Sequence, residues 1–384
     1  MRIGINLTFT PSGGSYTQAY HLLKLLPTED SSISFVIFTI MKNKGLLDLV
    51  ENEIKDIPVY YSSTSNKSSF FRVIWEQVYL SFLLKKWEVD ILFCPGNIAP
   101  IYTKCKTVQW VGTIGPFFKD FYKKFPLKIR FELFVNKLLM IYSAKKSIKV
   151  IFESNFTKEL FIDNFGFDEN KSEVIHIGKD NYFLQDNNYA VETSSNKYLL
   201  CVSHLYPYKN IENLLIAYAR INKLKNKIPI LKIAGDFRSP NYFDKLKNII
   251  AANNLNDKVQ FIGPVSKEEL KYLYTNCYFM IFPSPFENFA YTLVEAMSCG
   301  APIICSNTTA MPETCGDAAI YFDPYDVEEM EVKINLLLKD ENLRNTLKEK
   351  SLARVNELPD YEEVILQIFD IMKNLVKEIK KGVN

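Results

Sequence analysis

The chain has 384 residues, 47% of them apolar, so it is too long for a single hydrophobic core and suits two domains of ordinary size. Its net charge of only +2 gives no support to a strongly basic nucleic-acid-binding protein, and three histidines without a Cys-x-x-Cys pair argue against a zinc site. The seven cysteines are scattered, the start lacks a signal peptide's long apolar region, and no 18-residue apolar run occurs, which together predict a cytoplasmic protein with reduced thiols.

Short apolar runs alternate with longer helical patterns through the first half of the chain. Strands are predicted at 3–7, 34–40, 58–61, 91–94, 107–111 and 148–152. Helices are predicted near 15–26, 70–86, 128–143 and 155–164. Since such alternation implies a parallel sheet covered on both faces, we predict a doubly wound α/β domain over 1–180.

The same alternation restarts after a polar segment at 179–196, which we interpret as an interdomain linker. The second set of strands is predicted at 198–202, 228–234, 258–262, 278–282, 303–306 and 319–322. Helices are predicted between and after them, at about 210–224, 241–253, 266–275, 290–299, 326–339 and 361–379. Ligands of doubly wound sheets bind outside the carboxyl ends of the strands, so a second such domain at 197–360 predicts a ligand cleft.

A glycine pair follows the first strand, in the loop 10–15 that leads into a helix. Gly13 and Gly14 would let backbone amides approach an anion closely. The pattern is not Gly-x-Gly-x-x-Gly and no acidic residue follows at the expected distance, so a nicotinamide site has little support. A simple strand-to-helix turn remains the alternative.

Residues 117–150 carry nine lysines and arginines against two acidic residues, interleaved with phenylalanines and tyrosines. This composition suits peripheral docking on an anionic membrane leaflet. It equally suits a solvated helix face with core aromatics. Nucleic acid could also be attracted, but no recognition module accompanies the segment, so we expect no nucleic-acid partner.

Two glutamates mark the end of the predicted strand at 278–282 and the helix after it. Glu287 lies in a proline-rich loop, and Glu295 follows after seven intervening residues inside a helix that starts near Ala290. The first amides of a helix have no carbonyl partners within it and can bind an anion or sugar oxygens, while carboxylates accept hydrogen bonds from hydroxyls. The pattern indicates a nucleotide-sugar site, although an ordinary strand-loop-helix unit with two solvated glutamates would look similar.

The stretch 283–302 resembles the signature of the retaining glycosyltransferases with the GT-B fold, family 4, in which two glutamates are separated by seven residues. The resemblance implies that Glu287 and the amides of the three residues after it, Asn288, Phe289 and Ala290, hold the donor sugar. It likewise implies that Glu295 binds the ribose hydroxyls. Asn288 and Ala290 replace glycines that family members often have.

The stretch 201–210 also resembles the family, because a strand is followed by a basic residue, a proline and Lys-Asn. Lys209 matches the lysine that family members place on the donor diphosphate, and His204 stands where the family commonly has arginine. Read by itself, His204 is an ordinary loop residue. Cleavage of a sugar–phosphate bond leaves negative charge on the leaving group, which is why a cation is needed there.

Two further stretches, 233–236 and 259–265, resemble segments whose backbone lines the nucleotide pocket, and they place Gly235 and Gly263 there. Family members have a glycine turn like Gly13 and Gly14 near the donor diphosphate and the acceptor. Many also carry a histidine in the loop that corresponds to 108–117, and this chain has none in that loop. Any contact that depends on that histidine is therefore not expected.

Taken together, the resemblance implies two Rossmann-like domains facing across a cleft, with a helix at about 361–384 packing back on the first domain. It implies transfer of a hexosyl unit from GDP-mannose or a UDP-sugar to a glycan or polyprenyl-linked acceptor in bacterial surface polysaccharide synthesis, at the inner face of the cell membrane. Lys209 and Glu287 would be the catalytic residues, and no metal or other cofactor is expected because no Asp-x-Asp follows a strand. A nucleotide-sugar epimerase and a sugar-nucleotide-binding scaffold without transfer activity are the alternatives.

Overall fold

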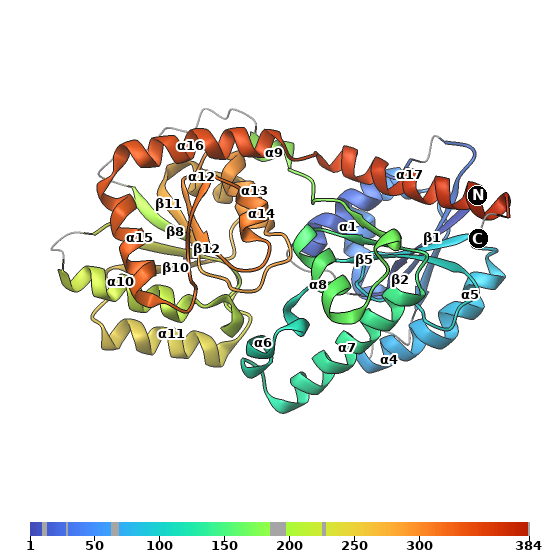
Figure 1. Ribbon diagram of the computed structural model, residues 1–384, viewed down its shortest axis with the longest axis horizontal. Helices are drawn as coiled ribbons and strands as arrows, with labels where there is room; N and C mark the ends of the chain where they lie inside the picture. The colour runs from blue at the N-terminus through green and yellow to red at the C-terminus, as the bar shows by residue number, and fades with distance from the viewer. Residues whose placement is uncertain (10–13, 28–29, 63–68, 185–196, 225–227, 383–384) are drawn as a thin grey trace. The chain divides into compact units, whose positions relative to one another are not determined.

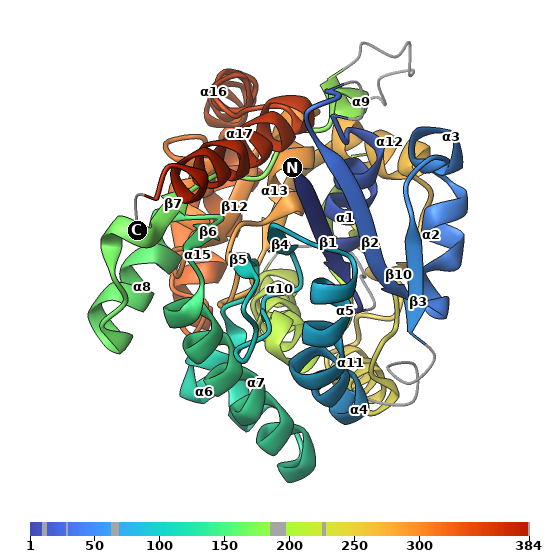
Figure 2. The ribbon, with the colours of Figure 1, turned by 90° about the vertical axis from the view of Figure 1, so that its right-hand side faces the viewer.

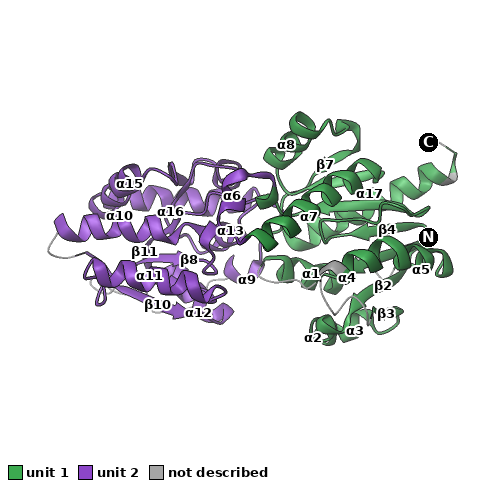
Figure 3. Cartoon of the chain, turned by 90° about the horizontal axis from the view of Figure 1, so that it is seen from below, with its two compact units in different colours: residues 1–116, 127–178, 360–384 green, residues 117–126, 179–359 purple. Residues whose placement is uncertain are grey.

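The computed structural model describes residues 1–9, 14–27, 30–62, 69–184, 197–224 and 228–382 (Figure 1). These residues form two compact units (Figure 3). Unit 1 comprises Met1–Pro116, Leu127–Gly178 and Asp360–Asn384, and unit 2 comprises Phe117–Pro126 and Lys179–Pro359. Each contains one parallel sheet with helices, so the prediction of two doubly wound α/β domains is confirmed.

The sheet of unit 1 has seven strands in the order β3-β2-β1-β4-β5-β6-β7. They are β1 (Arg2–Leu7), β2 (Ser34–Ile40), β3 (Val59–Ser62), β4 (Ile91–Cys94), β5 (Lys106–Val111), β6 (Lys149–Phe152) and β7 (Ser172–Val174). The first six coincide with predicted strands to within one residue or two. β7 was not predicted, because it has three residues and none of them is fully buried.

Helices cover both faces of this sheet. They are α1 (Gly14–Lys24), α2 (Lys44–Asp48), α3 (Glu51–Ile54), α4 (Ser69–Ile74), α5 (Leu80–Lys86), α7 (Leu127–Lys146), α8 (Asn155–Phe165) and α17 (Tyr361–Lys380), with short turns η1 (Met41–Asn43) and η4 (Glu169–Lys171). The helix predicted at 70–86 is interrupted, because a π-helical turn η2 (Trp75–Tyr79) separates α4 from α5.

α17 packs into the core of unit 1 beside α1 (Figure 1). A capping box in which Asp360 and Glu363 exchange side-chain and backbone hydrogen bonds starts the helix. Its apolar stripe is then buried, with the ring of Phe369 5.4 Å from that of Phe35 on β2. The most distant part of the sequence thus completes the same hydrophobic core as the first strand.

The sheet of unit 2 has six strands in the order β10-β9-β8-β11-β12-β13. They are β8 (Tyr198–Val202), β9 (Leu231–Ala234), β10 (Val259–Gly263), β11 (Cys277–Phe282), β12 (Ile303–Ser306) and β13 (Ala319–Phe322). The helices are α6 (Lys119–Lys123), α9 (Asn181–Leu184), α10 (Ile211–Leu224), α11 (Pro240–Ala252), α12 (Lys267–Asn276), α13 (Tyr291–Ser298), α14 (Met311–Cys315), α15 (Val327–Lys339) and α16 (Glu341–Asn356), with turns η3 (Gly115–Phe117) at the unit boundary and η6 (Pro207–Lys209).

Two predicted boundaries in unit 2 were wrong. The strand predicted at 228–234 begins only at Leu231, because Pro229 has no amide hydrogen to donate to a neighbouring strand. The start of the predicted linker at 179–196 is ordered in unit 2, where Lys179 Nζ donates to the carbonyl of Leu358 at 2.8 Å. The rest of that linker, 185–196, lies outside the described residues.

The segment Phe117–Pro126 belongs to unit 2, although it interrupts unit 1 in the sequence and we had assigned it to the first domain. The buried ring of Phe121 lies 4.9 Å from the ring of Tyr208 and 5.6 Å from that of Phe286. These aromatic contacts hold the segment against two loops of the unit 2 sheet. The basic stretch 117–150 is therefore divided between the two units.

Candidate functional site

The candidate site lies in unit 2, at the carboxyl ends of β8 and β11. These two strands are neighbours in the sheet and form the point at which the strand order reverses. Loops leave such a switch point in opposite directions, and ligands of doubly wound sheets generally bind there. The loop after β8 carries His204 and Lys209, and the loop after β11 carries Glu287.

Lys209 and Glu287 form an ion pair across this switch point. The Lys209 Nζ donates to Glu287 Oε1 at 2.5 Å, and each side chain is about 15% exposed. Burial by itself lowers the pKa of Lys209, but the charge and hydrogen bond of Glu287, together with Tyr208 and Cys201, outweigh it, so the pKa is raised. The structure thus brings together the two residues predicted to be catalytic and keeps the lysine charged.

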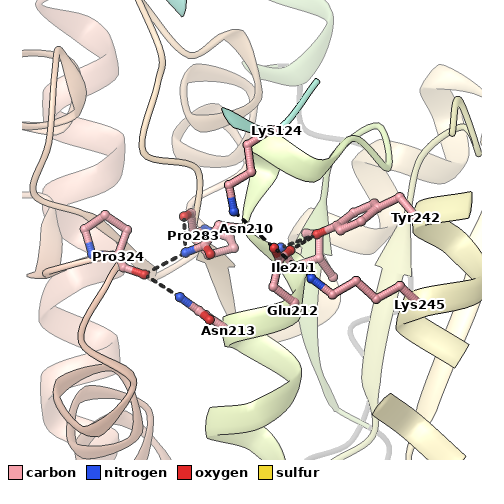
Figure 4. A network of polar contacts seen from close by, with 9 residues as sticks. All are labelled: Lys124, Asn210, Ile211, Glu212, Asn213, Tyr242, Lys245, Pro283 and Pro324. Carbon is pink, nitrogen blue, oxygen red and sulfur yellow. Dashed lines mark hydrogen bonds and ion pairs between the residues drawn. The ribbon is translucent and has the colours of Figure 1, made fainter. Parts of the chain in front are cut away.

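The turn that presents Lys209 is fixed by Asn210 (Figure 4). Asn210 has a φ of +61°, which asparagine tolerates better than most residues. Its buried side chain donates to the carbonyls of Pro283 at 3.3 Å and Pro324 at 2.7 Å. The loops after β8, β11 and β13 are thereby tied together beside the ion pair.

A second buried carboxylate, Glu212 at the start of α10, lies close to this turn (Figure 4). It accepts a hydrogen bond from the hydroxyl of Tyr242. Lys124 Nζ lies 3.3 Å and Lys245 Nζ 3.6 Å from Glu212 Oε1. Since Lys124 lies in the segment 117–126, this ion pair adds to the aromatic contacts that attach the segment to unit 2.

His204 lies at the end of β8, against the loop that follows β9. Its Nδ1 accepts from the amide of Asp236 at 3.4 Å, so the proton of the neutral ring is on Nε2, which can donate to an anion. Burial and the nearby cations Arg238 and Lys209 lower the pKa of His204. The histidine is therefore neutral at pH 7. It offers a hydrogen bond at the position where the resembling family commonly has a charged arginine.

The glycines predicted to line the nucleotide pocket lie at the ends of β9 and β10. The Gly235 amide donates to the Gly263 carbonyl at 2.8 Å. Gly235 has a φ of +139°, and a Cβ at this position would lie 2.1 Å from the carbonyl oxygen of Ser203. Only glycine fits there, and its place is at the same sheet edge as His204.

Glu295 lies on α13 and is partly buried. Tyr274 donates a hydrogen bond from its hydroxyl to Glu295 Oε2 at 3.1 Å. Burial raises the pKa of Glu295 to about 7, since it outweighs the hydrogen bond from Tyr274; the charge of Asp180 raises the pKa further and that of Lys267 lowers it. Hydrogen bonds from the hydroxyls of a bound ligand would stabilise the charged form of this carboxylate.

The residues between the two glutamates form the entry to α13. Asn288, Phe289 and Ala290 are all buried, with Ala290 at the N-cap of α13, where it has no side-chain oxygen to cap the helix. Gly14 is in unit 1 as the first residue of α1. Gly13 lies outside the described residues.

Sequence reasoning missed Tyr274 and Asn210 as parts of this site. Tyr274 is 21 residues from Glu295 and belongs to the preceding helix, and nothing in the local pattern connects the two. Asn210 is 73 residues from Pro283. In the part of the chain that the structure describes, no group of three or more His, Cys, Asp or Glu side chains could hold a metal ion.

Residues 186–354 match the model of a family described as glycosyl transferases group 1. Over this segment the chain is similar to the group 1 glycosyltransferases. The matched residues include Lys209, Glu287 and Glu295. They run from within the predicted linker almost to the end of α16.

Curated relatives to which the chain is similar include O-antigen mannosyltransferases. The Escherichia coli O-antigen chain mannosyltransferase B is 31% identical over 178 residues, which is 46% of each chain, so the chain spans about half the length of that relative. The Salmonella typhimurium O-antigen chain mannosyltransferase RfbU is 26% identical over 275 residues, covering 70% of this chain and 72% of the relative.

Solved structures match over nearly the full length. A glycosyltransferase from Rickettsia africae has a TM-score of 0.74 at 22% identity, with 98% of both chains covered. Anabaena Alr3699/HepE in complex with UDP-glucose has a TM-score of 0.74 at 18% identity, covering 97% of this chain and all of that one. At these identities the likeness shows the fold, which is GT-B.

Proposed function

We propose that the protein is a retaining glycosyltransferase, which moves a hexosyl unit from a nucleotide-diphosphate sugar to a hydroxyl of a glycan or lipid-linked acceptor. The Lys209–Glu287 ion pair at the switch point of the unit 2 sheet carries this proposal. The names of the relatives favour a mannosyl donor, for which GDP-mannose is the candidate. The UDP and UDP-glucose in the HepE structures favour a UDP-hexose as the second candidate.

The two partners of the ion pair would separate their roles when a donor binds. The ammonium group of Lys209 would turn from Glu287 to the diphosphate and stabilise the negative charge of the leaving group, while Glu287 would accept hydrogen bonds from sugar hydroxyls. His204 would add an Nε2 hydrogen bond to the phosphate. The leaving phosphate oxygen would help to deprotonate the acceptor hydroxyl on the same face of the sugar, and no metal or other cofactor enters this scheme.

The test of this function is a transfer assay with GDP-mannose and UDP-hexoses, using polyprenyl-linked glycans as acceptors. Formation of a glycoside whose anomeric configuration is that of the donor supports the proposal. A product of inverted configuration would refute the retaining route. Conversion of the donor to its epimer without any acceptor would instead identify an epimerase.

Nucleotide binding is expected to weaken as the pH falls below 7. In the free protein the pKa of Glu295 is raised from 4.5 to about 7. Ribose hydroxyls that donate hydrogen bonds to Glu295 would favour its deprotonated form, so the proton must leave when the nucleotide binds. Donor affinity should therefore rise with pH through 7 and level off above it, with a limiting slope of about tenfold per unit below the pKa.

Calorimetric titration of UDP and GDP between pH 5.5 and 8.5 measures this dependence. The Glu295→Gln variant should bind with no such slope. Protonation of His204 acts in the opposite direction, because a positive imidazole attracts the diphosphate, so the slope should steepen in His204→Asn. If the affinity of Glu295→Gln still rises with pH in the same way, the pH dependence belongs to another group.

We further propose that the enzyme acts at the cytoplasmic face of a membrane, docked through unit 1. Among the described residues no helix is long and apolar enough to span a bilayer. The helix α7 nevertheless exposes a stripe of large apolar side chains at helical spacing: Leu127, Phe131, Phe134, Leu138 and Tyr142. Five basic residues and one acidic residue accompany them on this helix. This composition favours an anionic leaflet over a neutral one.

A second exposed apolar stripe runs along α4, η2 and α5, through Phe71, Ile74, Val78 and Phe82. Both stripes lie on helices of one sheet face (Figure 2). Cys94 on β4 packs with α5, its register partner Gln109 on β5 donates to the carbonyl of Met140 on α7, and register partners point to the same face.

Membrane docking is tested by sedimentation with vesicles of phosphatidylglycerol and of phosphatidylcholine. We expect binding to the anionic vesicles only, weakened by salt and reduced about tenfold or more by Phe82→Glu or Phe131→Glu, because each carries charge onto an inserting surface. The matched control is Val332→Glu on α15 of unit 2, which is exposed to a similar extent. Equal vesicle binding by all three variants would exclude this face as the membrane-docking surface. If light scattering instead shows a dimer that the same two substitutions dissociate, the face is a subunit interface.

A further inference from the structure

The loop that carries Glu287 is held from a different strand end, the one after β12. The Glu287 amide donates to Thr309 Oγ1 at 3.2 Å. Thr308 Oγ1 donates to the carbonyl of Pro285 at 3.0 Å, and the Ala310 amide lies 3.4 Å from the carbonyl of Glu287. Three consecutive residues thus hold the backbone on both sides of the proposed sugar-binding carboxylate.

Thr309 adopts an unusual backbone conformation for its residue type. Its φ is +55°, in the left-handed region, where a β-branched residue is an outlier. Glycine would adopt this conformation without strain. The side chain of a threonine kept at such a position must therefore offset the conformational cost by the contacts that it makes.

The hydroxyl of Thr309 uses both of its hydrogen-bonding capacities. It donates to the carbonyl of Thr308 at 2.8 Å and accepts from the Glu287 amide. The donated bond orients the hydroxyl, so that a lone pair faces the amide. A valine of the same shape would keep the packing and lose both bonds, whereas a serine would keep the hydroxyl.

We propose that Thr309 is a positioning residue, which fixes the Glu287 backbone so that the carboxylate of Glu287 meets the hydroxyls of the donor sugar. This inference rests on the proposed function, in which Glu287 holds sugar hydroxyls. The same loop holds the Glu287 carboxylate 2.5 Å from Lys209 Nζ, so displacement of the loop would move the carboxylate relative to the rest of the site. A shift of about 1 Å in a positioned group can cost on the order of 100-fold in rate.

The test compares Thr309→Val, Thr309→Ser and Thr309→Gly in the full chain. Thr309→Val is expected to lower kcat of sugar transfer about tenfold with little change in KM for the acceptor, and to weaken GDP-mannose or UDP-glucose binding while leaving GDP or UDP binding unchanged. Thr309→Ser should restore the wild-type values. Thr309→Gly should lose activity like the valine variant, yet unfold at the same or a higher temperature, since its backbone strain is relieved.

Wild-type kcat and wild-type sugar-nucleotide affinity in Thr309→Val would overturn the inference. Equal losses of nucleotide and sugar-nucleotide binding, in step with a lower unfolding temperature, would also overturn it in favour of a purely structural turn. Glu287→Gln distinguishes the role of Glu287 from that of Thr309: if this variant transfers sugar at the wild-type rate, the proposed function of Glu287 itself is wrong. If Glu287→Gln is inactive and Thr309→Val is active, only the role of Thr309 fails. Should the valine variant not fold, the glycine and serine variants still decide between these outcomes.

Discussion

Replacement of Lys209 by methionine is expected to lower kcat for sugar transfer by about 100- to 1,000-fold, the usual effect of removing one group that stabilises developing charge. The neighbouring Glu287 helps to raise the pKa of Lys209, so the lysine stays charged. Because Lys209 lies at the switch point, it would face the leaving diphosphate as a full cation. The measurement is steady-state transfer with a saturating donor, together with the Kd of the nucleotide diphosphate.

The controls for this variant separate charge from folding. Lys209→Arg keeps the cation and should retain part of the activity, although its planar head group does not reproduce an ammonium. Lys209→Met leaves the carboxylate of Glu287 without its partner in a site that is only about 16% exposed, so stability must be measured as well. Lys350→Met on α16 removes another ion-paired lysine, one that lies 2.8 Å from Asp317, and should leave kcat unchanged.

The double variant Lys209→Met with Glu287→Gln removes the unpaired charge. If it regains the stability and still transfers sugar more slowly than Glu287→Gln alone, the loss in Lys209→Met belongs to catalysis. Activity of Lys209→Met within a few-fold of the wild type would contradict the role assigned to this lysine. A wild-type protein that binds a sugar nucleotide but transfers no sugar to any acceptor would favour the scaffold alternative.

Glu295→Ala is expected to weaken binding of the correct nucleotide, UDP or GDP, by about 1–3 kcal/mol, as for a lost charged hydrogen bond. The carboxyl group lies on α13 and accepts a hydrogen bond from the hydroxyl of Tyr274, and the resemblance of this stretch predicts that it binds the ribose hydroxyls. Calorimetric titration of the wild type and the variant with UDP and with GDP at pH 8 measures the loss of affinity and identifies the nucleobase that the site prefers.

Stability provides the control for Glu295. Because its pKa is raised from 4.5 to about 7 in the folded protein, the free protein loses stability as the pH rises through this interval, and the loss is complete above it. Glu295→Gln should therefore bind nucleotide poorly and yet be no less stable than the wild type at pH 8. Tyr274→Phe removes only the orienting bond and should have a smaller effect. Unchanged binding in Glu295→Ala would show that the ribose site lies elsewhere.

Local patterns in the sequence predicted the strands around the site well. β8 and β11 are continuous apolar runs because strands of a parallel sheet are buried on both faces, and this signal does not depend on the neighbours. The helix α16 was missed because its sequence is largely polar, with Leu347, Ser351 and Val355 as its buried residues. The π-helical turn η2 leaves no signature in hydrophobic periodicity.

The sequence by itself determined the two alternating α/β halves, the two glutamates seven residues apart and the lysine after β8, since each is a local pattern of residue types. Only the tertiary structure decided that Lys209 and Glu287, 78 residues apart, form one ion pair, because their meeting depends on β8 pairing with β11. The tertiary structure likewise placed the segment 117–126 in unit 2 and the Thr309 hydroxyl on the Glu287 amide. Strand order and long-range packing are properties of the whole folded chain, so no short stretch of sequence encodes such contacts.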